Sequence, residues 1–262
     1  MISTGEQQPV RPSVSLSRSV CLVCLFFVAW VLGCKRASES PDSTNRRATL
    51  STAAERGDLS QVRKLLREGG TVNERDSNGM TPLHFAAQCK NVSVVRALLE
   101  AGADVNAVRA GHVTPLMLSV DMAFGQPDIA LALIDAGADV NAADENGDTA
   151  LIIATTETSD QVFRALLDRK ANPNARGLDG RTALHYAAMN AFTDRVRLLL
   201  DYGADPAIRD SSGNVPYDEA TTTNPDREVQ ARFKAMRNLL SNWPQKGPRS
   251  KERLVGSPPS QP

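Results

Sequence analysis

A phrase of about 33 residues recurs along this 262-residue chain and constrains its fold more than any other feature. The threonines that open each copy follow one another at steps of 33, 35 and 33 residues; they are Thr81, Thr114, Thr149 and Thr182. The asparagines that close successive copies keep a similar step; they are Asn73, Asn106, Asn141 and Asn174. Because a fixed period of this size is typical of stacked repeats, the sequence predicts a solenoid with tails.

The copy at residues 76–106 shows how the phrase forms two helices. It begins with a turn signal, in which Gly79 is free to take a positive φ. Thr81 suits the N-cap of a first helix, and Pro82 suits its first position, where no backbone donor is needed. Apolar residues at helical spacing then mark a second helix, which Gly102 ends in a left-handed conformation.

This succession of turn, helix, helix and closing loop resembles the ankyrin repeat, down to the phrases Thr81-Pro82-Leu83-His84 and Gly102-Ala103-Asp104-Val105-Asn106. The resemblance covers about residues 48–242. It implies an all-α ankyrin-repeat solenoid of about six helix–turn–helix units joined by turn or hairpin loops. The first copy lacks the Thr-Pro-Leu-His opening, as expected of a terminal repeat. A last helix through Phe233 and Leu240, with charged residues between its apolar ones, suits a C-terminal cap.

Two copies depart from the pattern. In the third, His112 stands where the turn glycine belongs, and the link at residues 123–127 is two residues longer. The sequence leaves open whether this irregularity is drift or an adaptation to a partner. In the fourth, Lys170 replaces the glycine that follows the second helix. That replacement costs about 1 kcal/mol if the position stays left-handed.

An apolar run at residues 20–33 follows two arginines near the start of the chain. A basic flank and a short apolar core predict a secretory signal, because a membrane-spanning helix needs about 20 apolar residues. The run ends in Val31-Leu32-Gly33-Cys34, which resembles the lipobox of bacterial lipoproteins, so cleavage would leave Cys34 lipidated. Lys35 stands where the inner-membrane retention signal of such lipoproteins is usually Asp. The expected location is therefore the outer membrane, facing the periplasm. The alternative to a cleaved and lipidated segment is an uncleaved signal anchor in which the cysteine is incidental.

These patterns divide the chain into a lipoprotein signal peptide at residues 1–33, a lipidated cysteine with a flexible tether at 34–47, the ankyrin-repeat domain at 48–242 and a disordered, Pro-rich basic tail at 243–262.

The whole chain carries 30 basic and 30 acidic residues, which excludes a global footprint for nucleic acid. Residues 48–244 alone carry a net charge of −6. An acidic body of this kind either steers a basic partner or only keeps the surface soluble.

No catalytic or cofactor-binding motif with credible spacing occurs, so the sequence predicts neither an enzyme nor a cofactor. His84 and His185 occupy the same slot three copies apart, too far to share a metal ion. In ankyrin repeats this histidine is structural. Cys89 is interpreted as a partly buried apolar residue rather than a redox thiol. Aromatic and basic residues do not interleave as they would on a nucleic-acid-binding surface.

In ankyrin proteins the turn tips and the outer ends of the first helices line a concave groove that binds protein. Carried over by position, the candidate groove residues are Ser77, Asn78, Met80, Gln88, Cys89, Val113, Asp121, Met122, Glu145, Asn146, Asp148, Thr156, Glu157, Leu178, Asp179, Arg181, Met189 and Asn190. The set is mixed in chemistry, and its methionines suit an adaptable apolar contact. The alternative for each position is plain exposure to solvent.

The leading interpretation is a monomeric, membrane-anchored scaffold that binds a protein partner in the bacterial cell envelope without catalysis. A narrower version is an inhibitor or immunity-type protein that neutralises a toxin or enzyme, which rests on analogy alone. An enzyme with an unrecognised site near the third copy would need an acid–base pair that a stack of this kind does not offer. A cytosolic or host-delivered protein without a true leader is a further alternative, which cell fractionation would distinguish.

Overall fold

In the computed structural model, residues 49–120, 127–157, 159–221 and 227–243 are described. Their secondary structure consists of short helices in pairs, and within these ranges the only β pairing is an isolated bridge between Ala143 and Thr149. The α-helices are α2 (Leu50–Arg56), α3 (Leu59–Arg67), α4 (Pro82–Gln88), α5 (Val92–Glu100), α6 (Pro115–Val120), α7 (Pro127–Asp135), α8 (Ala150–Glu157), α9 (Asp160–Asp168), α10 (Ala183–Met189), α11 (Thr193–Asp201), α12 (Pro216–Glu219) and α13 (Arg227–Asn242). Two 3₁₀ turns, η1 (Ala110–His112) and η2 (Leu178–Gly180), lie in the loops.

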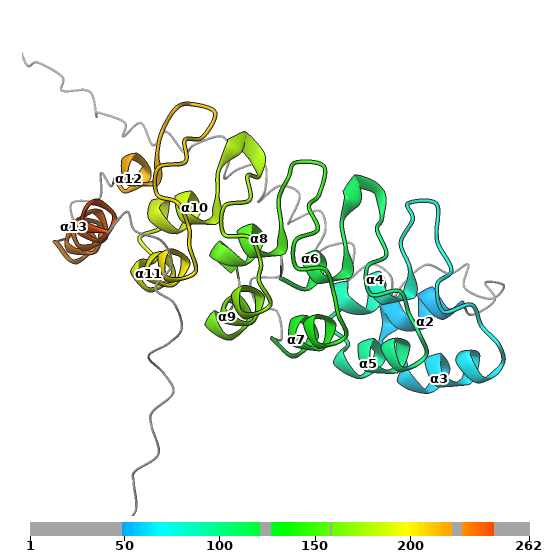
Figure 1. Cartoon of the computed structure of the whole chain (residues 1–262). Coiled ribbons are helices and arrows are strands. Elements are labelled where there is room, and N and C mark those ends of the chain that lie inside the picture. The colour runs from blue at the N-terminus through cyan, green and yellow to red at the C-terminus, as the bar shows by residue number, and fades with distance from the viewer. Residues whose placement is uncertain (1–48, 121–126, 158, 222–226, 244–262) are drawn as a thin grey trace, which may run out of the picture. The chain divides into compact units, whose positions relative to one another are not determined.

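The helices form two layers, which confirms the all-α repeat architecture (Figure 1). The inner layer comprises α2, α4, α6, α8, α10 and α12, and each of these helices contacts the next one in the row. Each inner helix also packs on the outer helix that follows it in the chain, from α3 to α13. The core therefore lies between the layers, where residues such as Leu83, Leu151 and Leu184 are fully buried.

The Thr-Pro-Leu-His phrase caps the inner helices, as its chemistry predicts. The Thr81 side chain accepts a hydrogen bond from the third residue of α4, and the His84 ring bonds back to the Thr81 N–H at 3.1 Å. Since His84 Nδ1 accepts from that N–H, the proton of the neutral ring lies on Nε2, which donates to the Val113 carbonyl at 3.2 Å. Thr182 and His185 repeat this arrangement, so both histidines are structural residues that bond to the next repeat.

The stability of the stack is expected to depend on the titration of His84. Burial lowers the pKa of His84 from 6.5 to about 4, because the charged ring would lose its solvation. The unfolded chain therefore binds this proton more tightly, so the stability present above pH 6.5 is lost as pH falls from 6.5 to 4, by up to about 3 kcal/mol. Chemical unfolding across this pH range measures the loss. In His84→Asn, the unfolding free energy should fall less steeply than in the wild type; parallel slopes would refute the assignment.

The closing asparagines connect each repeat to the next. Asn73 Oδ1 accepts the Asp104 N–H at 2.8 Å, and its amide nitrogen reaches the Gly102 carbonyl. The same pair of bonds recurs for the other three asparagines; these are Asn106, Asn141 and Asn174. The spacing of about one repeat between the bonded groups explains why the asparagines keep their step in the sequence.

Left-handed residues stand where the sequence predicts them. Gly79 has φ 77° in its turn, and Gly102 has φ 83° after α5. His112, at the glycine position of the third copy, is left-handed with φ 58°. Lys170, which replaces the glycine after α9, has φ 66°. The structure thus keeps the backbone of the repeat at these two positions and imposes left-handed strain on their side-chain-bearing residues. Three further non-glycine residues in the described ranges are also left-handed, which the sequence does not predict; these are Lys90, Asp179 and Ala191.

Replacing Lys170 with glycine is expected to raise the free energy of unfolding by about 1 kcal/mol, because glycine adopts a positive φ without steric cost. The Asn141 side chain would keep its bond, since it contacts the backbone carbonyl of position 170. Urea unfolding measures the change. Gly102→Ala is the matched opposite, because no atom lies within 4 Å of an added Cβ there and only the backbone is strained. A stabilising Gly102→Ala or a destabilising Lys170→Gly would contradict this assignment.

Arg195 connects the fourth and fifth repeats in a way that the repeat phrase does not encode. Its guanidinium lies 5.2 Å from the ring centre of Phe163 and 5.3 Å from that of Phe192. It donates to the carbonyls of Ala154 and Thr155, at the end of α8, where helical carbonyls have no partner within the helix. This arginine therefore caps an inner helix from the neighbouring repeat.

Several predictions fall on residues outside the described ranges. These are the signal peptide at 1–33, the lipidated Cys34 and tether at 34–47, the link at 123–127 apart from Pro127, and nearly all of the tail at 243–262. Among the described helices, none combines the length and the apolar character needed to cross a membrane.

Candidate partner-binding face

The hairpin loops stand in a row beside the inner helices, on the side away from the outer layer (Figure 1). Each loop is closed by its own backbone, and in three of them an aspartate accepts two N–H bonds; at Asp76 these come from Asn78 and Met80, both at 2.8 Å. Backbone bonds also connect neighbouring loops, since the Ala110 N–H donates to the Asn78 carbonyl at 2.8 Å. The loops therefore form one continuous, preorganised edge.

The structure places many candidate groove residues at this edge or at the ends of the inner helices. The exposed ones are Ser77, Asn78, Glu145, Asn146, Thr156, Leu178, Asp179 and Asn190. The half-buried ones are Met80, Gln88, Cys89, Val113, Asp148, Arg181 and Met189. Glu157 ends α8 but its side chain is not described, and Asp121 and Met122 lie outside the described ranges. Leu178 is the most exposed large apolar side chain among the described residues, at 51%.

The side chains of Asp148 and Arg181 have partners in the following repeats. Asp148 Oδ1 accepts the Leu178 N–H from the next loop at 3.2 Å. Arg181 forms an ion pair with Glu219 at 3.1 Å and lies 3.5 Å from the carboxylate of Asp210. These side chains hold the fourth, fifth and sixth repeats together, so a contact between either of them and a partner protein stays a prediction.

A row of large apolar side chains runs along the inner helices and is absent from the predicted set. Each member is the fourth residue of its inner helix, and the four are Phe85, Leu118, Ile153 and Tyr186. We call these four residues the apolar stripe. Leu118 is buried, whereas the other three are only partly buried against the core. The recurrence of an apolar residue at this offset in four copies was the signal that could have found them.

Carboxylates border the stripe at the fourth and fifth repeats. Burial raises the pKa of the Tyr186 hydroxyl, and the charges of Asp148 and Asp179 raise it further, whereas the charge of Arg181 lowers it. Burial also raises the pKa of Asp148, with a smaller contribution from the Asp144 charge, while the bond from the Leu178 N–H opposes it. The face thus combines apolar surface with negative charge.

The described residues provide little for metal binding. Among them, no group of three or more His, Cys, Asp and Glu side chains gathers as a metal site would require. Cys89 is half-buried at the end of α4, as predicted.

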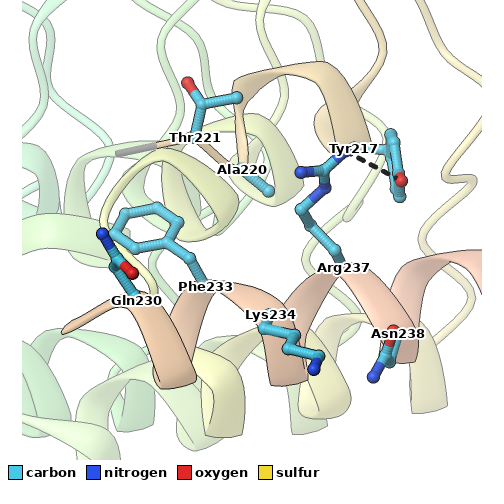
Figure 2. Close-up of a pocket in the computed structure, with 8 residues that line it drawn as sticks. All are labelled: Tyr217, Ala220, Thr221, Gln230, Phe233, Lys234, Arg237 and Asn238. Atoms are coloured by element: carbon cyan, nitrogen blue, oxygen red, sulfur yellow. Dashed lines mark hydrogen bonds between the residues drawn. The ribbon is translucent and has the colours of Figure 1, made fainter. Parts of the chain in front are cut away.

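A separate open pocket of about 500 Å³ lies between α12 and α13 in the last repeat (Figure 2). Arg237 donates to the Tyr217 hydroxyl at 3.0 Å, and its guanidinium lies 4.7 Å from the centre of that ring. Lys234 is a second cation among the lining residues, which include no carboxylate and no histidine. Arg237 therefore gives this end of the stack a polar cover.

These features define the class of protein: a stack of helical repeats whose repeated residues build the scaffold and whose loops carry variable residues along one edge. The family model for ankyrin repeats matches the chain in three overlapping copies, at residues 27–109, 50–144 and 116–210. The chain belongs to the ankyrin-repeat family, whose repeats generally serve as non-catalytic protein-interaction domains. No curated protein matches the chain.

Proposed function

We propose that this protein is a lipid-anchored scaffold that binds a protein partner through its hairpin loops and inner helices in the bacterial cell envelope. One observation supports the binding role: in each repeat the recurring residues form caps and bonds between repeats, while other residues remain at the loops and helix ends. Thr81, His84 and Asn73 are engaged in caps and bonds between repeats. The variable positions of the loops and inner-helix ends lie together on one preformed face, and preformed surfaces lose little entropy on binding.

The apolar content of the face supports a protein partner over a small ligand. Three members of the stripe are partly buried, and Leu178 is about half exposed at its loop. The stripe runs along four repeats, whereas small-molecule sites are enclosed clefts. A long, open surface with apolar residues at repeat spacing suits a protein chain.

The envelope location rests on the N-terminal sequence. Its apolar run is followed by Val31-Leu32-Gly33-Cys34, and residues 35–47 are polar without an apolar period. Two or three acyl chains at Cys34 would anchor the protein stably, since each buried methylene contributes roughly 0.8 kcal/mol. A tether of about 13 residues spans at most roughly 45 Å, which would hold the repeats off the membrane surface.

Crosslinked capture from isolated envelopes tests the binding role. Leu178→Lys places a positive charge on the exposed loop, so a partner recovered with the wild type should be lost or strongly reduced with this variant. Glu100→Lys is the matched control, because Glu100 is exposed on the outer helix α5. Equal recovery with both variants would show that the loop face is not the binding site.

A further inference from the structure

Resting on the proposed function, we infer that the partner segment bound on this face is basic and amphipathic. Its apolar side chains would lie on the apolar stripe, and its Lys or Arg side chains would face the carboxylates of the fourth and fifth repeats. Three independent features of the chain carry this inference: the distribution of charge, the partners of the acidic side chains, and their position beside the stripe.

Charge is distributed very unevenly along the repeats. Between Arg109 and Arg164 the sequence contains nine Asp and Glu residues and no Lys or Arg. This interval covers the third repeat and half of the fourth, including the inner helices α6 and α8 that carry Leu118 and Ile153. A partner segment that crosses the middle of the stripe therefore meets a negative surface without any cation from these helices to offset it.

Two carboxylates on the outer side of this interval form ion pairs, whereas no ion pair is found among the described residues for those on its loops. Asp135 pairs with Arg169 at 2.8 Å, and Asp160 pairs with Arg195 at 3.1 Å. Among the described residues no ion pair involves the loop carboxylates, which are Asp144, Glu145, Asp148 and Asp179. Negative charge thus remains on the face where the stripe lies.

The loop carboxylates lie next to the stripe. Asp148 and Asp179 lie close enough to the hydroxyl of Tyr186, a member of the stripe, to raise its pKa. The Arg181 charge opposes them there, but Arg181 is itself paired with Glu219. Glu145 extends toward the third repeat, because a Cβ placed on Gly111 would lie 3.6 Å from its oxygen Oε1. A chain lying along the stripe would therefore have carboxylates of two successive loops within reach of its Lys or Arg side chains.

The chain's own basic residues are the competing occupant. Residues 245–262 carry a net charge of +3 and include the apolar pair Leu254-Val255. The stripe, however, extends back to Phe85 in the second repeat, beyond what the single apolar pair of this tail would cover. We therefore assign the face to a separate protein, and the test distinguishes the two occupants.

The test places a photo-crosslinking amino acid at Asn146, an exposed loop position, in the full-length protein in its native membrane. The crosslinked partner segment is identified by mass spectrometry. A segment with net positive charge and apolar residues at strand or helix spacing is the expected result. A neutral or acidic partner segment would overturn the inference but leave the proposed partner binding on this face in place. An adduct with residues 245–262 would also overturn the inference, because the chain's own tail would then occupy the face. Loss of every partner adduct from this face would instead contradict the proposed function itself.

Charge reversal provides the second arm. Glu145→Lys is expected to lower the adduct yield at least about fivefold at low salt, and added salt should weaken the wild-type contact. Glu100→Lys is the matched control, since Glu100 is also exposed but ends the outer helix α5. Equal yields from the two variants, or a salt-independent wild-type yield, would overturn the inference.

Discussion

Replacing Phe163 with alanine is expected to lower the free energy of unfolding by about 3–5 kcal/mol, the largest stability change that we predict for this chain. Phe163 is fully buried in α9 and is the largest of the fully buried side chains. Removing its ring would leave a cavity in the core and would also take away one of the two rings beside the Arg195 guanidinium. Urea or thermal unfolding of the two proteins measures the difference.

Phe163→Leu separates the two contributions. Leucine fills much of the same volume but offers no ring to Arg195, so its cost should be clearly smaller than that of alanine. If Arg195 depends on Phe163 for its position, the cap on the carbonyls of Ala154 and Thr155 should loosen in both variants. Hydrogen exchange at the end of α8 reports this. A loss below about 1 kcal/mol in Phe163→Ala would mean that the core does not pack as described.

Replacing Cys34 with serine is expected to abolish the incorporation of radiolabelled fatty acid, because serine lacks the thiol that receives the lipid. If cleavage depends on that lipid, the variant should also accumulate as a larger species that retains residues 1–33. Metabolic labelling with palmitate followed by electrophoresis measures both changes. This complete loss of labelling is the largest expected effect on lipid attachment, since the polar residues 35–47 offer no apolar surface to a membrane.

Cys89→Ser is the matched control, because Cys89 lies in the repeat domain at the end of α4. This variant should remain labelled and membrane-bound like the wild type. If the wild type and Cys34→Ser are both unlabelled and both remain in the membrane fraction, the short apolar run acts as an uncleaved anchor. The lipoprotein assignment would then be wrong.

Features that are local to one repeat could be predicted from the sequence. The cap at Thr81, the left-handed Gly79 and Gly102, and the left-handed Lys170 each follow from a few neighbouring residues. Their conformations depend on backbone sterics and short-range hydrogen bonds, which a sequence pattern states directly.

Contacts between repeats could not be predicted in the same way. Arg181 was assigned to the groove by its position in the phrase, yet it pairs with Glu219, 38 residues further along the chain. Arg195 reaches back 40 residues to the Thr155 carbonyl. Such pairs depend on how a long side chain lies across the stack, and neither partner belongs to the repeated phrase. The apolar stripe is absent from the predicted set because the groove residues were taken only from the turn tips and the outer ends of the first helices.

The central claim is that one face of the stack, formed by loops and the ends of inner helices, binds a protein partner. Photo-crosslinking in intact cells from two exposed positions tests it most directly: Asn190 at the end of α10 and Arg96 on the outer helix α5. We predict a discrete protein adduct from position 190 and none from position 96. An adduct from position 96 alone, or from neither position, would contradict the account.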